Sequence, residues 1–190
     1  MKKNKAVFLD RDGTIIRDKN YLSSPEDTEL YSGVTEALKL LKSAGFLLIV
    51  CTNQSGMARG LFSEEDYYAV EKRLGKLLAA HGVVIDKTYC CPHLPDGTVK
   101  RYAVKCRCRK PEKGMFLAAQ KEFNIDFKSS YAIGDSPRDL IPAKELGAAT
   151  ILVLTGKGKR LKELTDSKNS VDYVCRNLYY AAKKIINILG

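Results

Sequence analysis

Short apolar runs alternate with longer amphipathic segments along most of the chain. Continuous apolar stretches are typical of strands that are covered on both faces. They predict strands at residues 5–9, 46–51, within 83–91, 129–135 and 149–156, with a sixth candidate at 170–175. Because helical patterns separate these runs, the sequence predicts a central parallel sheet with helices on both faces, a Rossmann-like three-layer α/β sandwich.

The intervening helices are predicted from apolar residues three and four positions apart. Residues 33–44 have this spacing, with Ser32 as the candidate cap and Gly45 as the stop. A long helix is expected over 63–82, which opens with a serine and two acidic residues. Further helices are predicted over 112–123, over 136–147 and from the sixth strand to Leu189, whereas 92–111, with three prolines and dense charge, is predicted to be a loop.

Polar residues directly follow the predicted strands. In a parallel sheet the carboxyl ends of the strands lie at one edge, and ligands bind beyond that edge. The segments expected to converge there are Asp10–Thr14, Thr52–Ser55, the loop after Cys91, and Gly134–Asp139.

The first predicted strand ends on Asp10 and Asp12. Side chains two apart in an extended chain share a face, so the two carboxylates are expected to point into one space, with Arg11 pointing the other way and taking no catalytic part. Such a pair requires a cation or a proton. One Asp could attack phosphorus while the other gives and takes a proton. The alternative is a helix cap or a turn.

The other strand ends carry groups that suit a phosphate and a cation. Thr52 and Asn53 offer a hydroxyl and an amide to phosphate oxygens, and Lys110 could neutralise phosphate charge. Asp135 and Asp139 could complete a Mg²⁺ site, because this ion prefers oxygen ligands. The alternative for Thr52 and Asn53 is a polar turn, and the alternative for Lys110 is a solvated surface lysine. The two acids could instead cap a helix.

The segments "DRDGT", "TNQSG", the stretch around Lys110 and "GDSPRD" together resemble the motifs of the haloacid dehalogenase superfamily of phosphatases, in the same order. The resemblance implies that Asp10 is the nucleophile and Asp12 the general acid and base. It implies Mg²⁺ bound by Asp10, the backbone carbonyl of Asp12, and Asp135, with Asp139 in support. The residues that it implies bind the transferring phosphate are Thr52, Asn53 and Lys110.

Four of the six cysteines fall within residues 90–108. In a chain that we expect to be cytosolic and that is long enough to form its own core, such a cluster favours a metal site over disulfides. Cys91, His93, Cys106 and Cys108 could close a tetrahedral zinc site, and a site without an open position is structural. Cys90 is the alternative to Cys91 as a ligand. Buried or unpaired cysteines would be the interpretation without a metal.

The cysteine-rich insert resembles that of two branches of the superfamily, the heptose bisphosphate phosphatases and the histidinol-phosphate phosphatases. The stretch "TNQSGMARGLFSEEDY" resembles the heptose branch, whereas the histidinol branch has an Asp where Ser55 stands. Arg59 and Arg109 could hold the distal end of a bisphosphate. Gln54 and Ser55 are also expected to line the substrate site.

The resemblance implies Mg²⁺-dependent removal of the C7 phosphate from D-glycero-D-manno-heptose 1,7-bisphosphate through an aspartyl-phosphate, supplying ADP- or GDP-heptose biosynthesis. A histidinol-phosphate phosphatase and a phosphatase of nucleic-acid ends are the alternative enzymes. A zinc-bearing binding protein with an inactive site is the alternative of another class.

Composition adds limits to this interpretation. A chain of 190 residues suits one domain, residues 1–190, without a large cap domain. The net charge of +10 favours anionic ligands, and seven Lys or Arg lie within residues 100–113. The apolar stretch near the start is too short for a signal peptide, so we expect a cytoplasmic protein, a monomer without nucleic-acid or membrane partners. We assign no catalytic role to residues 155–173.

Overall fold

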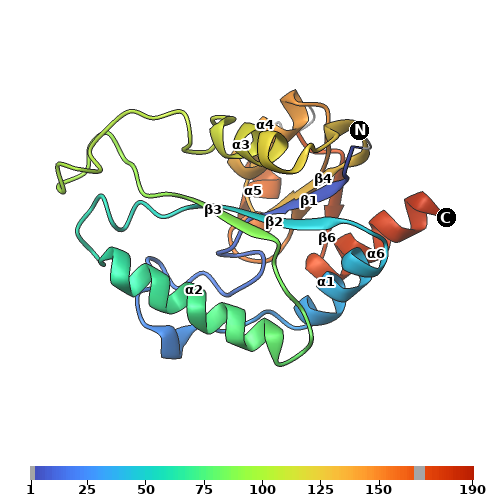
Figure 1. Ribbon diagram of the computed structural model, residues 1–190, viewed down its shortest axis with the longest axis horizontal. Coiled ribbons are helices and arrows are strands. Elements are labelled where there is room, and N and C mark those ends of the chain that lie inside the picture. The colour runs from blue at the N-terminus through green and yellow to red at the C-terminus, as the bar shows by residue number, and fades with distance from the viewer. Residues whose placement is uncertain (1–2, 165–169) are drawn as a thin grey trace.

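The computed structural model describes residues 3–164 and 170–190 and is organised around a six-stranded sheet (Figure 1). All neighbouring strands pair in parallel, in the order β3-β2-β1-β4-β5-β6. The strands are β1 (Ala6–Leu9), β2 (Leu47–Asn53), β3 (Lys87–Cys91), β4 (Tyr131–Gly134), β5 (Ala149–Val153) and β6 (Tyr173–Cys175). The predicted parallel α/β fold is confirmed, including its sixth strand.

The strand order reverses its direction between β1 and β4. The chain first builds β1, β2 and β3 towards one edge, and it then returns to the other side of β1 to build β4, β5 and β6. Such a reversal separates the loops that follow the two central strands, and it opens a crevice at their carboxyl ends. Asp10 and Asp135 directly follow these two strands.

Helices cover both faces of the sheet. Helices α3 and α4 lie on one face, and α1, α2 and α6 lie on the other (Figure 1). The helices are α1 (Val34–Ser43), α2 (Glu64–Ala79), α3 (Gly114–Phe123), α4 (Pro137–Glu145), α5 (Gly158–Leu164) and α6 (Leu178–Leu189), with 3₁₀ turns η1 (Pro25–Asp27) and η2 (Phe127–Ser129).

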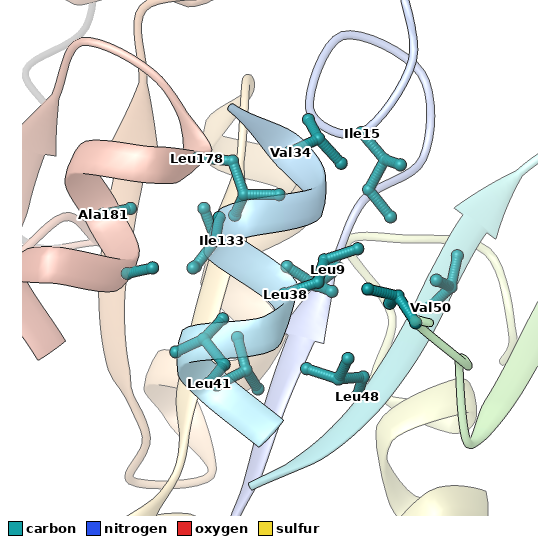
Figure 2. Close-up of a cluster of buried hydrophobic side chains, with 14 of the residues drawn as sticks. Leu9, Ile15, Val34, Leu38, Leu41, Leu48, Val50, Ile133, Leu178 and Ala181 are labelled. Carbon is teal, nitrogen blue, oxygen red and sulfur yellow. The ribbon is translucent and has the colours of Figure 1, made fainter. Parts of the chain in front are cut away.

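The alternation of side chains in the strands divides the core into two parts. In β1, Val7 and Leu9 pack towards α1 and α6, whereas Phe8 packs in the other cluster with Phe116 of α3. Figure 2 shows the first cluster, in which Leu38 of α1 lies over the sheet. Because both faces of the central strands are buried, β1, β2 and β5 have the continuous apolar character from which they were predicted.

Two local predictions about helices were wrong. The N-cap of α1 is Gly33, in the left-handed region at φ 80°, and not Ser32. Helix α5 lies in a stretch for which no helix was predicted. The capping box of α2 is present, because the Ser63 hydroxyl accepts from the Asp66 backbone and the Asp66 carboxylate accepts from the Ser63 backbone.

Between β3 and α3 the described chain forms a long loop, as predicted, which extends away from the sheet (Figure 1). Within the described ranges, no helix is long and apolar enough to cross a membrane.

Candidate active site

Two acidic side chains lie at the carboxyl ends of the central strands. The Asp10 backbone N–H donates to the Ile133 carbonyl of β4 at 3.0 Å, which extends the pairing of the strands up to the site. One carboxylate oxygen each from Asp10, Asp135 and Asp139 lies within 4.8 Å of the other two, and all three residues are buried. The sheet therefore brings together acids that are more than a hundred residues apart in the chain.

Lys110 supplies the positive charge at the centre of this acidic cluster. Its ammonium donates to Asp10 Oδ1 at 2.8 Å and to the Cys51 carbonyl at 2.6 Å, and it pairs with Asp139 Oδ1 at 2.7 Å. The side chain is only 1% exposed. Burial opposes its charge, yet Asp10 and Asp139 raise the pKa of Lys110 above its ordinary value. The solvated lysine considered from the sequence is therefore excluded.

The acids carry more negative charge than Lys110 balances. Burial, together with the Asp139 charge, raises the pKa of Asp10 to about 8 and that of Asp135 to about 6. Three buried carboxylates beside one ammonium leave an excess of two negative charges when all are ionised. An oxygen-rich cluster of this charge fits a divalent cation such as Mg²⁺.

Asp12 lines the same cavity as Asp10 but is not part of the acidic cluster. Its Oδ2 accepts from Arg11 Nε at 3.0 Å and from Gln54 Nε2 at 2.7 Å. Arg11 is 1% exposed and also pairs with Glu71 at 2.8 Å. The expectation that Arg11 points away from the pair was wrong, because its guanidinium turns back to hold the Asp12 carboxylate.

Asn53 and Gln54 use their amides to organise the site. Asn53 both donates to the Lys110 carbonyl and accepts from the Lys110 N–H, each at 3.0 Å. Gln54 donates to Asp12 and, at 2.8 Å, to the Thr52 hydroxyl. The Asn53 amide therefore holds Lys110 in place, and the Gln54 amide holds Asp12. Asn53 and Gln54 also border the cavity.

Gly13 allows the chain to pass close to Asp135. Its φ of 87° lies in the left-handed region, and an added Cβ would come within 2.2 Å of the Asp135 carboxylate. Only glycine satisfies both the dihedral angle and this contact.

A cavity of about 230 Å³ opens above these groups, and it brings the predicted substrate-binding residues together. These residues, all of which border it, are Thr52, Asn53, Gln54, Ser55, Arg59, Arg109 and Lys110. The sequence assigned no role to further residues of its wall: Asp18, Asn20, Tyr21, Leu22, Arg138 and Lys157.

Cys91, His93, Cys106 and Cys108 form a second group that could hold a metal. The Cys108 sulfur lies 3.1 Å from Cys91 Sγ, 3.3 Å from Cys106 Sγ and 3.3 Å from His93 Nδ1. A tetrahedron with Zn–S bonds of about 2.3 Å has edges near 3.8 Å, so a zinc ion fits after a small expansion. Cys91 rather than Cys90 belongs to the group, as preferred from the sequence.

The cysteine loop packs against the segment that follows β2. Tyr102 forms a buried cluster with Met57, Phe62 and Tyr67, and the Val99 N–H donates to the Ala58 carbonyl at 3.0 Å. These two loops border the cavity on one side through Arg59 and Arg109. A metal that fixes the cysteine loop would therefore also fix this wall.

Curated relatives show the family to which this arrangement belongs. A D-glycero-beta-D-manno-heptose-1,7-bisphosphate 7-phosphatase from Haemophilus ducreyi is 47% identical over 155 residues, covering 80% of this chain and 85% of the relative. The protein of the same name from Escherichia coli K12 is 40% identical over 174 residues, covering 91% and 89%. The chain belongs to the heptose 1,7-bisphosphate 7-phosphatase family. Residues 107–181 also match the HAD-hydrolase-like family model.

Solved structures of this family agree with the fold. The D,D-heptose 1,7-bisphosphate phosphatase from B. bronchiseptica, solved in complex with magnesium and phosphate, has a TM-score of 0.86 at 33% identity, covering 97% of this chain and 99% of its own. The enzyme from Burkholderia thailandensis has a TM-score of 0.72 at 32% identity, covering 96% and 99%. The predicted haloacid dehalogenase fold is thereby confirmed.

Among the unpredicted residues of the cavity wall, Lys157 lies in the segment to which we assigned no role. Its backbone N–H donates to Asp135 Oδ2 at 2.7 Å. Residues 165–169 of that segment lie outside the described residues. Arg138 stands within the segment Gly134–Asp139 that was expected at the site, although no role was predicted for it. No motif identifies Lys157 in the sequence, because its place depends on how the loops after β4 and β5 meet.

Proposed function

We propose that the protein is a Mg²⁺-dependent phosphatase that removes the C7 phosphate of D-glycero-D-manno-heptose 1,7-bisphosphate and leaves the 1-phosphate. The observation that carries this proposal is the buried cluster of Asp10, Lys110 and Asp135, with Asp12 on the same cavity. The family relatives are named for this substrate as its beta anomer, and we propose the same anomer here.

Two transfers of the phosphoryl group account for the reaction. The Asp10 carboxylate attacks phosphorus, the bond from phosphorus to the C7 oxygen breaks, and Asp12 gives that oxygen a proton. Asp12 then takes a proton from water, whose oxygen attacks the aspartyl-phosphate and releases inorganic phosphate and free Asp10. Arg11 and Gln54 keep the Asp12 carboxylate oriented towards the cavity through both steps.

The magnesium ion would be held by Asp10, Asp135 and the backbone carbonyl of Asp12. When bound, it neutralises carboxylate and phosphate charge that would otherwise oppose the approach of a nucleophile. Lys110 provides a second positive charge against the transferring phosphate, and Asp139 keeps its ammonium in place. The Thr52 hydroxyl provides a further contact to phosphate oxygens.

The distal phosphate of the substrate would meet the basic wall of the cavity. Arg59 is exposed there, and Arg109 is anchored through a bond of 3.1 Å from its Nη1 to the His93 carbonyl. A bisphosphate gains from both cations, whereas the ammonium of histidinol phosphate would be repelled by them. Ser55, which is neutral, borders the same wall.

We propose that the protein acts as a monomer in the cytoplasm, with one domain over residues 1–190 and with a zinc ion that stabilises the cysteine loop. Its partner is the phosphorylated heptose rather than a nucleic acid or a membrane. A cavity of about 230 Å³ accommodates part of a sugar phosphate, which suits a small molecule.

The experiment that tests this function is ³¹P NMR on the pure beta and alpha anomers of the bisphosphate, with Mg²⁺ and with a chelator. We expect inorganic phosphate to form only with Mg²⁺ and faster from the beta anomer. The organic product should keep the phosphorus resonance that couples to the anomeric proton.

Histidinol phosphate, measured under the same conditions, is the comparison substrate. Loss of the anomeric phosphate, or a higher kcat/KM on histidinol phosphate, would contradict the proposal.

A further inference from the structure

The loop after β5 contacts three parts of the active site at once. The Thr155 hydroxyl donates to the Gly13 carbonyl at 2.6 Å, and the Gly156 N–H donates to the Tyr31 hydroxyl at 3.1 Å. Lys157 contributes twice, through its backbone and through its side chain. This loop therefore connects strand β5 to the nucleophile loop and to the segment that follows it.

The contact between Lys157 and Asp18 reaches the wall of the cavity. Residues 17–29 leave the core and return to it, and an antiparallel bridge between Ile16 and Leu30 closes the base of this excursion. Its cavity side is Asp18–Leu22. We call residues 17–29 the flap.

The flap has an unusual backbone where it borders the cavity. Asn20 and Tyr21 both have positive φ, 53° and 68°, although neither is glycine. Two consecutive non-glycine residues in this left-handed region are costly, and they persist only when surrounding contacts hold them. Asp18 supplies such contacts, because its carboxylate accepts from the Asn20 N–H at 3.0 Å and from Lys157 Nζ at 2.8 Å.

The Asp18–Lys157 pair is well suited to hold this conformation. The Asp18 side chain is 16% exposed and that of Lys157 is 41% exposed. Solvent therefore screens the ion pair mainly from the side of Lys157. Burial acts to raise the pKa of Asp18, yet the bonds from Lys157 and Asn20 keep it below its ordinary value, which keeps the carboxylate charged.

We infer that Lys157 is a positioning residue that fixes the sugar-binding wall relative to the reacting phosphate. Its backbone N–H holds Asp135 at the phosphate end, and its ammonium holds Asp18 and the flap at the sugar end. Tyr21 lies on that wall, with the Arg59 guanidinium 6.0 Å from its ring. This inference rests on the proposed function for the identity of the sugar.

The test compares Lys157→Met, Asp18→Asn and the double variant with the natural protein. A substitution at Lys157 leaves its backbone N–H in place, so the contact to Asp135 is kept. We therefore expect kcat and the Mg²⁺ concentration at half-saturation to stay within twofold of the natural values, which corresponds to about 0.4 kcal/mol. KM for the bisphosphate should rise about fivefold in each single variant. The double variant should show about the same fivefold rise, because both changes break one contact.

Three comparisons make the result specific. Lys157→Arg should keep the natural KM, and Lys159→Met, at an exposed residue of the adjacent helix α5, should leave it unchanged. Acetyl phosphate, which has no sugar, should keep its KM in all variants. An equal rise in KM for acetyl phosphate would overturn the inference. A natural KM for the bisphosphate in Asp18→Asn, together with a raised KM in Lys157→Met, would also overturn it, because Lys157 would then bind substrate itself.

Hydrogen exchange separates this inference from the proposed function. Amide exchange over residues 18–22 should be faster in Lys157→Met than in the natural protein, whatever the substrate is. Unchanged exchange would overturn the role of Lys157. If the natural protein fails to hydrolyse the bisphosphate while exchange responds as expected, the proposed function fails and the link between Lys157 and the flap stands.

Discussion

The two candidate metal sites in the described part of the chain are assembled over very different lengths of sequence. The cysteine group is drawn from residues 91–108, the end of β3 and the loop that follows it, whereas the ion pair at the acidic cluster joins residues 100 positions apart. The cysteine group needs a metal to hold its four ligand atoms together, although the buried cluster around Tyr102 also orders part of the loop. The acidic cluster is ordered by the sheet, and it therefore exists before any cation binds. The comparison predicts that the two sites can be disabled separately.

The largest effect is expected from Asp10→Asn. The amide cannot attack phosphorus, so kcat for the bisphosphate should fall by at least roughly 10⁴-fold. The zinc content, measured by mass spectrometry, should be unchanged, because the cysteine loop does not contain Asp10. Asp96→Asn, an exposed acid of the cysteine loop, is the matched control. Phosphate release by Asp10→Asn at the natural rate would contradict the mechanism.

Cys108→Ser should break the other site. Cys108 lies at the centre of the group, within 3.3 Å of three other ligand atoms, so its loss should remove zinc on dialysis. The cavity wall formed by Arg59 and Arg109 then loses its support, and kcat/KM for the bisphosphate should fall by up to about 10²-fold.

Hydrolysis of acetyl phosphate, which does not reach that wall, should change little in Cys108→Ser. Cys175→Ser, outside the cysteine group, is the control. If Cys108→Ser keeps its zinc and its activity on the bisphosphate, the loop does not depend on this ligand.

The pH dependence of Mg²⁺ binding would sharpen the comparison. The pKa values of Asp10 and Asp135, raised to about 8 and about 6, mean that these carboxyls hold protons at pH 6 that a cation must displace. Affinity should therefore weaken as pH falls, by up to about a hundredfold from pH 8 to pH 6, most of it from Asp10. Calorimetric titration with MgCl₂ measures this change. Equal affinity at both pH values would show that binding displaces no proton.

The smallest effect is expected from Ser63→Ala, which removes the capping box of α2. The free energy of unfolding should fall by about 1 kcal/mol in a urea titration. Both sites should be retained, so kcat/KM and zinc content should match the natural protein. Ser43→Ala, at the last residue of α1, is the control, and an equal loss of stability there would mean that the cap is not the cause.

The same contrast between local and distant assembly explains what the sequence could predict. The central strands were found because each is a continuous apolar run, and the candidate ligands Cys91 and Cys108 because they stand near each other in a recognisable pattern. Asp10 and Asp135 were found because a rule about parallel sheets brings strand ends together. Each of these predictions depends on information that lies within a few residues or in a general property of the fold.

The residues that were missed depend on contacts between irregular loops. Asp18 and Lys157 are separated by most of the chain, and neither stands in a periodic pattern or directly after a strand. The direction of the Arg11 side chain was predicted wrongly because the alternation of side chains applies only to an extended chain. The chain turns immediately after Asp10, where the Arg11 carbonyl accepts from the Ile15 N–H. Side-chain direction cannot be read from alternation once a strand has ended.

The contact between two glycines limits how this enzyme can change over evolutionary time. A Cβ added at Gly156 would lie 2.1 Å from the Asp135 carboxylate and 2.7 Å from the Gly13 Cα, so two loops meet there through bare backbone. Substitutions at these positions are unfavourable, because any other residue would displace the Asp135 carboxylate, which we propose holds the magnesium ion. New substrate preferences must therefore arise in the flap and in the two loops around Arg59 and Arg109, which can vary while the reacting centre stays fixed.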